Sequence, residues 1–539
     1  MPKLYFCFFL IVSLDALQAQ KNYKLDAIQQ PIPDALSALN FDTSKHYTSS
    51  QWQKLTNHWQ KLAIQAGYFL FDLRVSKRTD SLDYFQIYYG PFFSGISYCE
   101  SDSIIKTFDA DQLNARVEDT LNWYLNNGYP FANIKLKYQS AKDPLVHLTA
   151  ISGPHVRWGQ VYVKPEGIIK PKVLQKMLQI DSEQAFSLKA MDNLKPGNLH
   201  QMPFKLVRAP EWAYNDNSAD IYFYIETIRV SSATGIIGLQ TNPGNQQASL
   251  VGELNVQLQN NWQKNEKIQL HWRSIAPQSQ QLKTKIQLPF IAGSSYGFKS
   301  GLTMYKRDTS FIEVRTNVSL GYQFAHGWQL STQIDHWLSN TIANQTTNEL
   351  SSFHSTTYGL SLERQFLDNI VNPRKGMDLV VNYLVGNKKT DQTTFTWRLA
   401  LQQKFYVPLG KRQVFCWSGQ LDHLQAPIIF SNELYRFGGL ERMRGFDEDA
   451  FFASSIVFSG LEYRYLLEEN SYALLFTDWA WSENKINLSQ NERLYALGLG
   501  LVLGTENGQF KLNYALGAQI GQGLRFNAAK VHLGYISYF

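Results

Sequence analysis

Three adjacent acids, Asp447, Glu448 and Asp449, could in principle act as a general acid and a general base. Two carboxylates take these roles when their surroundings push their pKa values apart. The three acids lie in the glycine-punctuated stretch RFGGLERMRGFDEDAFFAS, residues 436–454, which reads as a loop. Adjacent carboxylates in an open loop are usually solvated, so we interpret them as a polar surface and not as a catalytic pair.

No other catalytic or metal-binding pattern stands out in the sequence. It has no histidine and cysteine spacing suited to a metal, no glycine loop that would cradle a phosphate, and no Gly-x-Ser-x-Gly. The 11 histidines are scattered, and Cys99 and Cys416 are too far apart in sequence to suggest a framework. We therefore predict no enzymatic activity, no cofactor and no metal site.

Composition and the N-terminal segment point to an exported protein. The chain is 44% apolar and 14% aromatic, and it lacks the apolar runs of roughly 18 residues that helical membrane proteins need. The net charge of +6 comes without a block of like charges, so no nucleic-acid partner is expected. MPKLYFCFFLIVSLDALQAQ has one lysine, an apolar core and a small Ala19, which predicts a signal peptide over residues 1–19. A short buried strand is the alternative.

The region after the signal peptide predicts small α+β modules. Apolar residues at helical spacing are followed by a glycine and an alternating strand, first around Gly67 and again around Gly128. The two helical stripes consist of Trp52, Leu55, Trp59 and Leu62, and of Leu113, Val117, Leu121 and Leu125. This repeat predicts modules at 20–95 and 96–156, and a looser third one at 157–229; unrelated α+β domains are the alternative.

From residue 230 to 539 a period of two replaces the helical period. In TFTWRLALQQKF, Phe395, Trp397 and Leu399 face one way, while Arg398 and Gln402 face the other. The apolar face would be the core of a soluble sandwich or the lipid-facing band of an outer-membrane barrel. Segment length, aromatic residues near segment ends and the signal peptide favour the barrel. We predict an all-β transmembrane barrel of about 16 antiparallel strands.

By this count, the stretch that holds residues 436–454 connects the eleventh and twelfth strands on the outer side of the membrane. The connection is roughly 30 residues long, and loops of that length are usually functional or disordered. Its glycines and aromatic residues argue against disorder. The sequence therefore predicts a functional loop at this place.

The loop resembles a motif of the BamA/TamA-type outer-membrane assembly and transport superfamily, a glycine pair followed by (Val/Ile)-Arg-Gly-(Phe/Tyr). The matching residues are Gly438, Gly439, Met443, Arg444, Gly445 and Phe446, with methionine in place of the usual branched residue. The resemblance implies that the loop folds back into the barrel lumen.

The resemblance extends along nearly the whole mature chain. The modules resemble POTRA domains, for which Gly-Tyr-Pro-Phe after a helix is typical, and LDNIVNPRKGMDL is similar to the family's strand entry. The C-terminus is similar to the family's insertion signal. These two motifs are carried by Asp368, Pro373 and Gly376, and by His532, Gly534 and Phe539.

An arginine placed in the lumen by this loop needs carboxylate partners, because its planar fork matches a carboxylate in two hydrogen bonds. On strand alternation, Glu462 points into the lumen, whereas the direction of Asp478 is open. We expect Arg444 to bond to Glu462, with Asp478 as the second partner. An exposed loop arginine without a fixed partner is the alternative.

The resemblance implies a factor that inserts polypeptides into the outer membrane of a Gram-negative bacterium or moves them across it. Periplasmic modules would receive unfolded outer-membrane or secreted client chains, and the barrel would act at the seam between its first and last strands, about 234–242 and 528–539. Outer-membrane lipids are implied partners, with accessory lipoproteins or periplasmic chaperones as further candidates. A two-partner-type secretion transporter, or a passive or ligand-binding porin with anchor modules, is the alternative.

Overall fold

The computed structural model describes most of the chain after the N-terminal segment. The described residues are 22–28, 36, 42–68, 71–79, 82–90, 92, 96–100, 103–108, 110–138, 145–194, 202–241, 248–276, 279–324, 327–342, 350–440 and 442–539. The predicted signal peptide at 1–19 lies outside them. In the described ranges, no helix combines the length and the apolarity needed to cross a membrane.

The first module is a four-stranded sheet with one helix. Its strands β1 (Asn22–Ile28), β2 (His46–Thr48), β3 (Asp72–Arg78) and β4 (Leu82–Tyr88) lie in the order β2-β1-β4-β3, and α1 spans Ser49–Gln65. The helical stripe forms as predicted, because Trp52 and Trp59 are both buried in the core of this module and pack edge to face at 6.0 Å between ring centroids. Gly67 follows the helix at a φ of 89°, a left-handed conformation that ends helices and favours glycine.

The second module repeats this arrangement. Its strands β5 (Ile96–Glu100), β6 (Ser103–Phe108), β7 (Asn133–Tyr138) and β8 (Leu145–Ile151) lie in the order β6-β5-β8-β7, with α2 over Ala110–Asn126. Gly128 ends the helical region at a φ of 91°, as Gly67 does in the first module. The helix, glycine and strand thus recur in the same order in both modules.

The third module contains two short helices, α3 (Pro171–Met177) and α4 (Leu188–Asn193). In its sheet, β12 (Ser218–Thr227) pairs with β9 (Arg157–Lys164) and lies between β10 (Phe204–Leu206) and β11 (Glu211–Asn215). Alternate residues of β12 contribute to the core of the third module. Ala219, Ile221, Phe223 and Ile225 are all fully buried or nearly so. The period of two in this strand therefore reflects one buried face.

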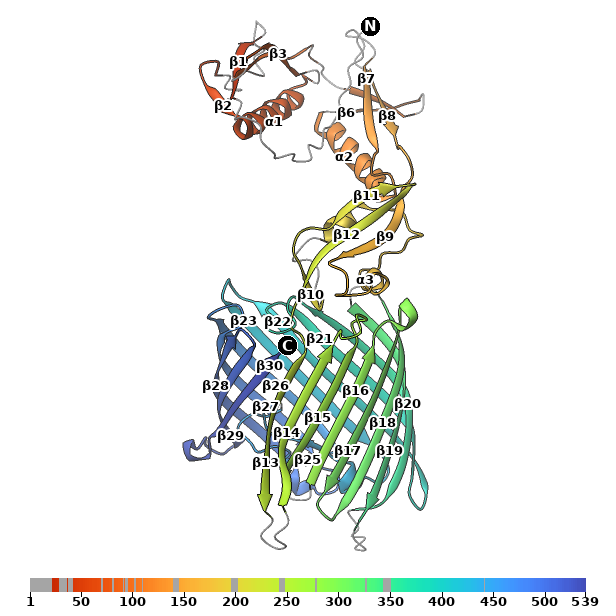
Figure 1. Ribbon diagram of the computed structural model, residues 1–539, viewed down its shortest axis with the longest axis vertical. Helices are drawn as coiled ribbons and strands as arrows, with labels where there is room; N and C mark the ends of the chain where they lie inside the picture. The colour runs from red at the N-terminus through yellow and green to blue at the C-terminus, as the bar shows by residue number, and fades with distance from the viewer. Residues whose placement is uncertain are drawn as a thin grey trace. The chain divides into compact units, whose positions relative to one another are not determined.

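The remaining strands close into a single antiparallel barrel (Figure 1). They are β13 (Ser232–Thr241), β14 (Ala248–Gln259), β15 (Lys267–Ala276), β16 (Ser279–Leu288), β17 (Tyr296–Arg307), β18 (Phe311–Gln323), β19 (Trp328–Thr341), β20 (Phe353–Leu367), β21 (Gly376–Lys389), β22 (Thr393–Pro408), β23 (Gln413–Gln425), β26 (Ser455–Leu466), β27 (Tyr472–Glu483), β28 (Glu492–Thr505), β29 (Gly508–Gln519) and β30 (Lys530–Tyr538). The barrel has 16 strands, which confirms the predicted fold class.

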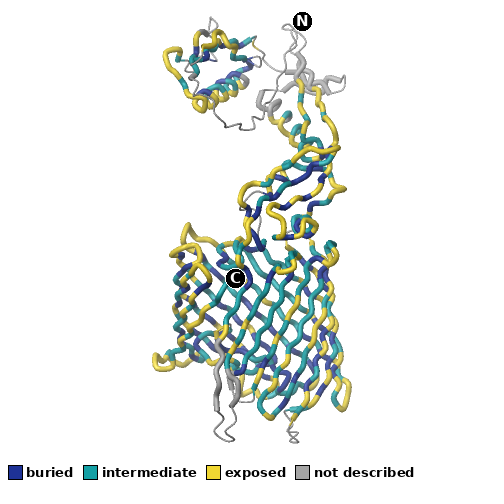
Figure 2. The backbone as a smooth tube through the Cα atoms, viewed as in Figure 1, coloured by how far each residue is buried: buried dark blue, intermediate teal, exposed yellow. Residues whose placement is uncertain are grey.

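The two faces of the barrel wall have the polarity of a membrane barrel. Phe395 and Leu499 point outward and are 57% and 56% exposed, whereas the inward-facing Arg398 and Asp335 are 4% and 2% exposed. Most of the wall is intermediate in burial, with buried and exposed residues interspersed (Figure 2). Apolar side chains outside and enclosed charges inside are the reverse of a water-soluble sandwich, and they match a lipid-facing band around a polar lumen.

The predicted functional loop lies between β23 and β26, the eleventh and twelfth strands in chain order. It contains a hairpin of two short strands, β24 (Tyr435–Phe437) and β25 (Phe451–Ala453). Strand direction alternates, so this connection lies at the end of the barrel opposite to the start of β13 and to the C-terminus. We call residues 426–454 the lumen segment.

Candidate functional site in the barrel lumen

The lumen segment contacts strands on the far side of the barrel from its own attachment points. Arg436 donates a hydrogen bond of 2.8 Å to Glu313 on β18, and its guanidinium lies 3.9 Å from the ring centroid of Tyr305 on β17. Asn432 donates to the Ser339 hydroxyl on β19 at 2.7 Å. The segment leaves β23 and returns to β26, several strands away from β17, β18 and β19 around the wall. It therefore crosses the interior of the barrel.

Arg444 is held by two carboxylates from the barrel wall. Its Nε and Nη2 donate to the two oxygens of Asp478 on β27 at 2.8 and 2.6 Å, and its backbone N–H donates to the same carboxylate at 3.1 Å. Its Nη1 donates to Glu462 on β26 at 2.8 Å. The guanidinium also lies 3.6 Å from the ring centroid of Phe476. Asp478 thus accepts two hydrogen bonds from the guanidinium and Glu462 accepts one. We expected Glu462 to be the first partner and Asp478 the second, so the order is reversed.

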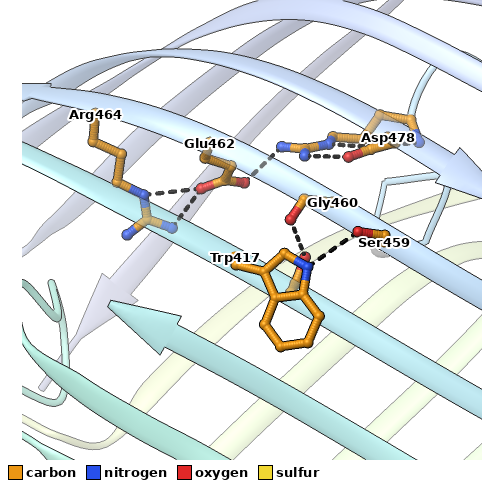
Figure 3. Close-up of polar contacts among 8 residues, drawn as sticks. Trp417, Ser459, Gly460, Glu462, Arg464 and Asp478 are labelled. Carbon is orange, nitrogen blue, oxygen red and sulfur yellow. Dashed lines mark hydrogen bonds and ion pairs between the residues drawn. The ribbon is translucent and has the colours of Figure 1, made fainter. Parts of the chain in front are cut away.

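Glu462 is shared between two arginines (Figure 3). Arg464, two residues further along β26, donates to the second oxygen of Glu462 through Nε at 2.9 Å and Nη2 at 2.6 Å. Asp478 is fully buried, and the side chains of the other three residues are at most 16% exposed. Ion pairs in such an enclosed place are little screened by salt, so we treat Arg444, Glu462, Arg464 and Asp478 as one unit, the Arg444 cluster.

Three glycines let the lumen segment follow this path. Gly438, Gly439 and Gly445 have φ values of 120°, 97° and 92°, which L side chains rarely adopt. A Cβ atom on Gly445 would lie 2.7 Å from the backbone nitrogen of Gly517 on β29, so the segment runs directly against the wall there. On Gly439 a Cβ atom would collide with the carboxylate of Glu448, inside the segment itself.

Apolar residues of the lumen segment pack on the inner wall next to the Arg444 cluster. Met443 is fully buried, although its φ of 75° is unusual for a residue with a side chain. Phe437, Met443 and Ala453 join buried wall residues in one core, and Phe446 packs against it. The wall residues of this core are Ile456, Phe458, Ala480, Leu494 and Ala496. Burial of this apolar area gives the inward fold a hydrophobic contribution besides its ion pairs.

The three acids that we interpreted as a solvated surface have cationic partners. Arg273 on β15 pairs with Asp449 and, at 3.4 Å, with Glu448, and Lys530 on β30 lies 2.6 Å from Asp447. Only Asp447 keeps a largely exposed side chain, at 77%. The interpretation as a purely solvated surface is therefore wrong for Glu448 and Asp449, because residues far away in the sequence supply Arg273.

Another ion pair of the lumen segment was not predicted from the sequence. Lys388 on β21 donates to Glu433 at 2.7 Å and to the carbonyl of Ile428 at 2.5 Å, and the two side chains are 1% and 3% exposed. Burial raises the pKa of the Glu433 carboxyl above its usual range, and Lys388 acts in the opposite direction. In the sequence, Lys388 is recognisable only as a residue on the polar side of an alternating strand. That position does not indicate which carboxylate it pairs with.

The other two predicted motifs lie apart from the Arg444 cluster. Asp368 is in the turn between β20 and β21, where its carboxylate accepts the backbone N–H groups of Arg374 and Lys375 at 2.9 and 3.1 Å. Pro373 is buried in this turn, and Gly376 begins β21 at a φ of 127°. A Cβ atom on Gly376 would lie 1.9 Å from the Phe366 carbonyl oxygen, so this strand entry depends on glycine.

The C-terminal motif lies on the last strand. His532 and Gly534 on β30 pair with Asn513 and Lys511 on β29. Phe539 is 58% exposed, and its backbone N–H donates to the carbonyl of Ser231 at 3.0 Å. These residues therefore lie where the two ends of the barrel meet.

The chain is similar to a known protein family and to several solved structures. A family model described as the Omp85 superfamily domain matches residues 244–530, more than half of the chain. No curated protein sequence matches the chain.

Solved structures with a similar fold were also found. CdiB from Escherichia coli aligns with a TM-score of 0.56 at 13% identity, over 91% of this chain and 97% of its own. CdiB from Acinetobacter baumannii aligns with a TM-score of 0.52 at 14% identity, over 91% and 98%. BamA from Haemophilus ducreyi lacking POTRA domains 1–3 aligns with a TM-score of 0.46 at 11% identity, over 82% of this chain and 95% of its own. At these identities the likeness concerns the fold alone.

Proposed function

Because this chain belongs to the Omp85 superfamily, we propose that its modules receive client polypeptides and that its barrel inserts them into the outer membrane through the seam between β13 and β30. The family match confirms the resemblance drawn from the loop motif. The barrel lies in the outer membrane of a Gram-negative cell, with the POTRA-like modules in the periplasm. Membership in this family supports a role in protein insertion or translocation at that membrane.

The observation that carries the proposal is the short pairing at the seam. Among the described residues, β13 and β30 share only two register pairs, Ser232 with Tyr538 and Ala233 with Ser537. On its other side β13 pairs with β14 along its whole length, from Ser232 to Thr241. The wall opposite is paired much further, because β20 and β21 stay in register from His354 with Lys389 to Leu367 with Gly376. The barrel is thus closed least firmly at this seam.

A seam of this kind exposes strand edges that a client can use. Beyond Ala233, the edge of β13 that faces β30 has no strand partner among the described residues. Unpaired N–H and C=O groups on a strand edge bind an incoming strand by β-augmentation, and in lipid every such group needs a partner. An entering client strand would supply those partners. This supports insertion at the seam.

Two other functions compete with insertion at the seam. A two-partner-type transporter would export a secreted chain through the lumen, and a porin would pass small solutes through it. Export of a polypeptide through the lumen would require the lumen segment to leave the interior, which breaks its buried ion pairs with β18, β21, β26 and β27. Opening the seam leaves those pairs intact, which favours insertion as the first candidate.

The test is a covalent lock across the seam. Ala233→Cys and Ser537→Cys, introduced together in a chain with Cys99 and Cys416 replaced by alanine, place two thiols at directly paired positions. We expect oxidation to stop client assembly and deplete other outer-membrane β-barrels, and a reductant to restore both. Ser331→Cys with Ser361→Cys, a register pair between β19 and β20, is the matched control and leaves assembly unaffected.

The result distinguishes the three functions. If the locked seam leaves barrel assembly intact while a secreted protein still reaches the medium, export through the lumen replaces the proposal. If neither is affected and only the uptake of small solutes depends on the protein, it is a porin with anchor modules.

A further inference from the structure

The inner face of the barrel near the periplasmic end is rich in lysine. Lys299 on β17 bonds at 2.5 Å to Glu363 on β20, three strands away around the wall, so both side chains point into the lumen. Lys299 is in register with Gln287 on β16, and Gln287 is in register with Lys267 on β15. Directly paired residues share a face of the sheet. Lys267 therefore faces the lumen, and so does Lys285, two residues before Gln287.

The same reasoning applies around the rest of the wall. Arg398 on β22 bonds at 2.7 Å across the lumen to Asp335 on β19, so Gln402 and Lys404, four and six residues further along, also face inward. In the half of the lumen nearer the periplasm, as far as the structure describes its residues, the inward-facing cations outnumber the inward-facing carboxylates. The cations are Lys267, Lys285, Lys299, Lys404, Arg464 and Lys511, and the carboxylates are Glu363, Asp378 and Glu462.

Most of these lysines lack a carboxylate partner. Lys299 pairs with Glu363, and Arg464 pairs with Glu462, which also receives Arg444. Within the described part of the chain, no carboxylate lies at ion-pair distance from the ammonium groups of the other four lysines. These are Lys267, Lys285, Lys404 and Lys511. Lys404 is in register with Asp378 on β21, but the cations still outnumber the carboxylates, so this region carries a net positive charge.

The region is also accessible to solvent. Lys285, Gln402 and Lys404 all belong to the exposed residues although they face inward. An inward-facing side chain in a filled barrel would be buried, as Arg398 is higher on the same strand at 4% exposure. Solvent therefore reaches these inward-facing positions, although the lumen segment extends as far as Glu462 through Arg444.

From this placement we propose that the periplasmic half of the lumen is an open, net-positive vestibule that concentrates anionic groups and repels cationic ones. A cavity lined by one sign of charge within low-dielectric walls focuses its field and raises the local concentration of oppositely charged ions. Rings of charged side chains select ions in pores by the same means. A vestibule of this kind is compatible with insertion, with export and with conduction of solutes.

The experiment measures the potential inside the vestibule with charged thiol reagents. Gln402→Cys, in the full-length chain with Cys99 and Cys416 replaced by alanine, places a thiol two residues from Lys404 on the same face. The probes are an anionic and a cationic methanethiosulfonate of similar size. The rate at which each reagent modifies the Gln402→Cys thiol is divided by its rate with a small free thiol, which corrects for the intrinsic reactivity of the reagent. We expect the anionic reagent to be favoured by roughly tenfold or more.

Charge variants show whether the lysines cause this preference. Lys285→Gln with Lys404→Gln reduces it several-fold. Lys306→Gln with Lys389→Gln is the matched control, because both residues are exposed on the outward face and the net charge of the chain changes equally; it leaves the preference unchanged. Ser489→Cys, in an exposed connection between β27 and β28, reports the preference outside the lumen.

A measurement without lysine substitutions guards against a variant that fails to fold. In the Gln402→Cys chain alone, raising the salt from about 20 mM to about 1 M shortens the screening length several-fold and reduces the preference for the anionic reagent. Equal normalised rates for the two reagents, a preference that ignores salt, or a thiol that neither reagent reaches would each overturn the inference.

Discussion

Arg444 and Asp478 are joined by three hydrogen bonds, two from the guanidinium and one from the backbone N–H of the arginine. The carboxylate therefore binds both the side chain and the main chain of the lumen segment at one point. Glu462 contributes one further bond to Arg444 and is itself satisfied by Arg464. Asp478 therefore makes more of the contacts that hold Arg444 than Glu462 does.

Replacing Arg444 should destabilise the inward position of the lumen segment. Arg444→Ala leaves the fully buried Asp478 without its cation, and losing one partner of a buried pair costs on the order of 3–5 kcal/mol. Arg444→Lys rescues only part of this, since lysine cannot make the two parallel bonds. Heat-modifiable migration along a urea series measures the loss.

Arg442 provides the control for this experiment in the same segment. Its guanidinium makes no hydrogen bond to Asp422 at 3.8 Å and its side chain is 35% exposed, so Arg442→Ala should cost clearly less than Arg444→Ala. If Arg444→Ala and Arg442→Ala have equal effects, the Arg444 cluster does not hold the segment.

A double-mutant cycle should rank the two acids. The coupling energy between Arg444→Ala and Asp478→Asn should exceed that between Arg444→Ala and Glu462→Gln, because Asp478 receives three bonds from Arg444 and Glu462 receives one. Unfolding in denaturant, followed for the four chains of each cycle, gives both values. A larger coupling with Glu462 would support the order expected from the sequence alone.

The buried pair of Lys388 and Glu433 should be a second attachment of the lumen segment. Glu433→Ala leaves Lys388, 1% exposed, without its carboxylate and should cost on the order of 3–5 kcal/mol. Lys388→Met with Glu433→Leu removes both charges and should recover most of that loss. The measurement is protease cleavage of the segment in intact cells; cleavage that is equal in the single and double variants would contradict the prediction.

The modules should fold without the barrel. In a fragment that ends at Arg229, Trp59→Ala removes a ring that is 1% exposed and should cost about 3–5 kcal/mol. Trp123→Ala removes a ring that is 58% exposed and should change stability by no more than about 0.5 kcal/mol. Thermal unfolding by circular dichroism compares them. A fragment without a cooperative transition would show that the modules need the barrel.

Local sequence patterns are enough to predict most of the helices and strands. A strand reverses the direction of its side chains at every residue, so the alternation of Phe395 and Trp397 with Arg398 identifies the wall whatever the strand pairs with. Helical spacing likewise identifies the stripe of Trp52 and Trp59 in α1. Each of these signals lies within one element, and a single sequence is enough to read it.

Contacts across the lumen could not be read in the same way. Arg436 meets Glu313 over a separation of 123 residues, and Arg273 meets Asp449 over 176. Which residues face each other there depends on strand number, register and closure of the whole barrel, and none of these is encoded near either partner. For the same reason the sequence left the direction of Asp478 open and made the acids 447–449 look solvated, while only the closed barrel decided their partners.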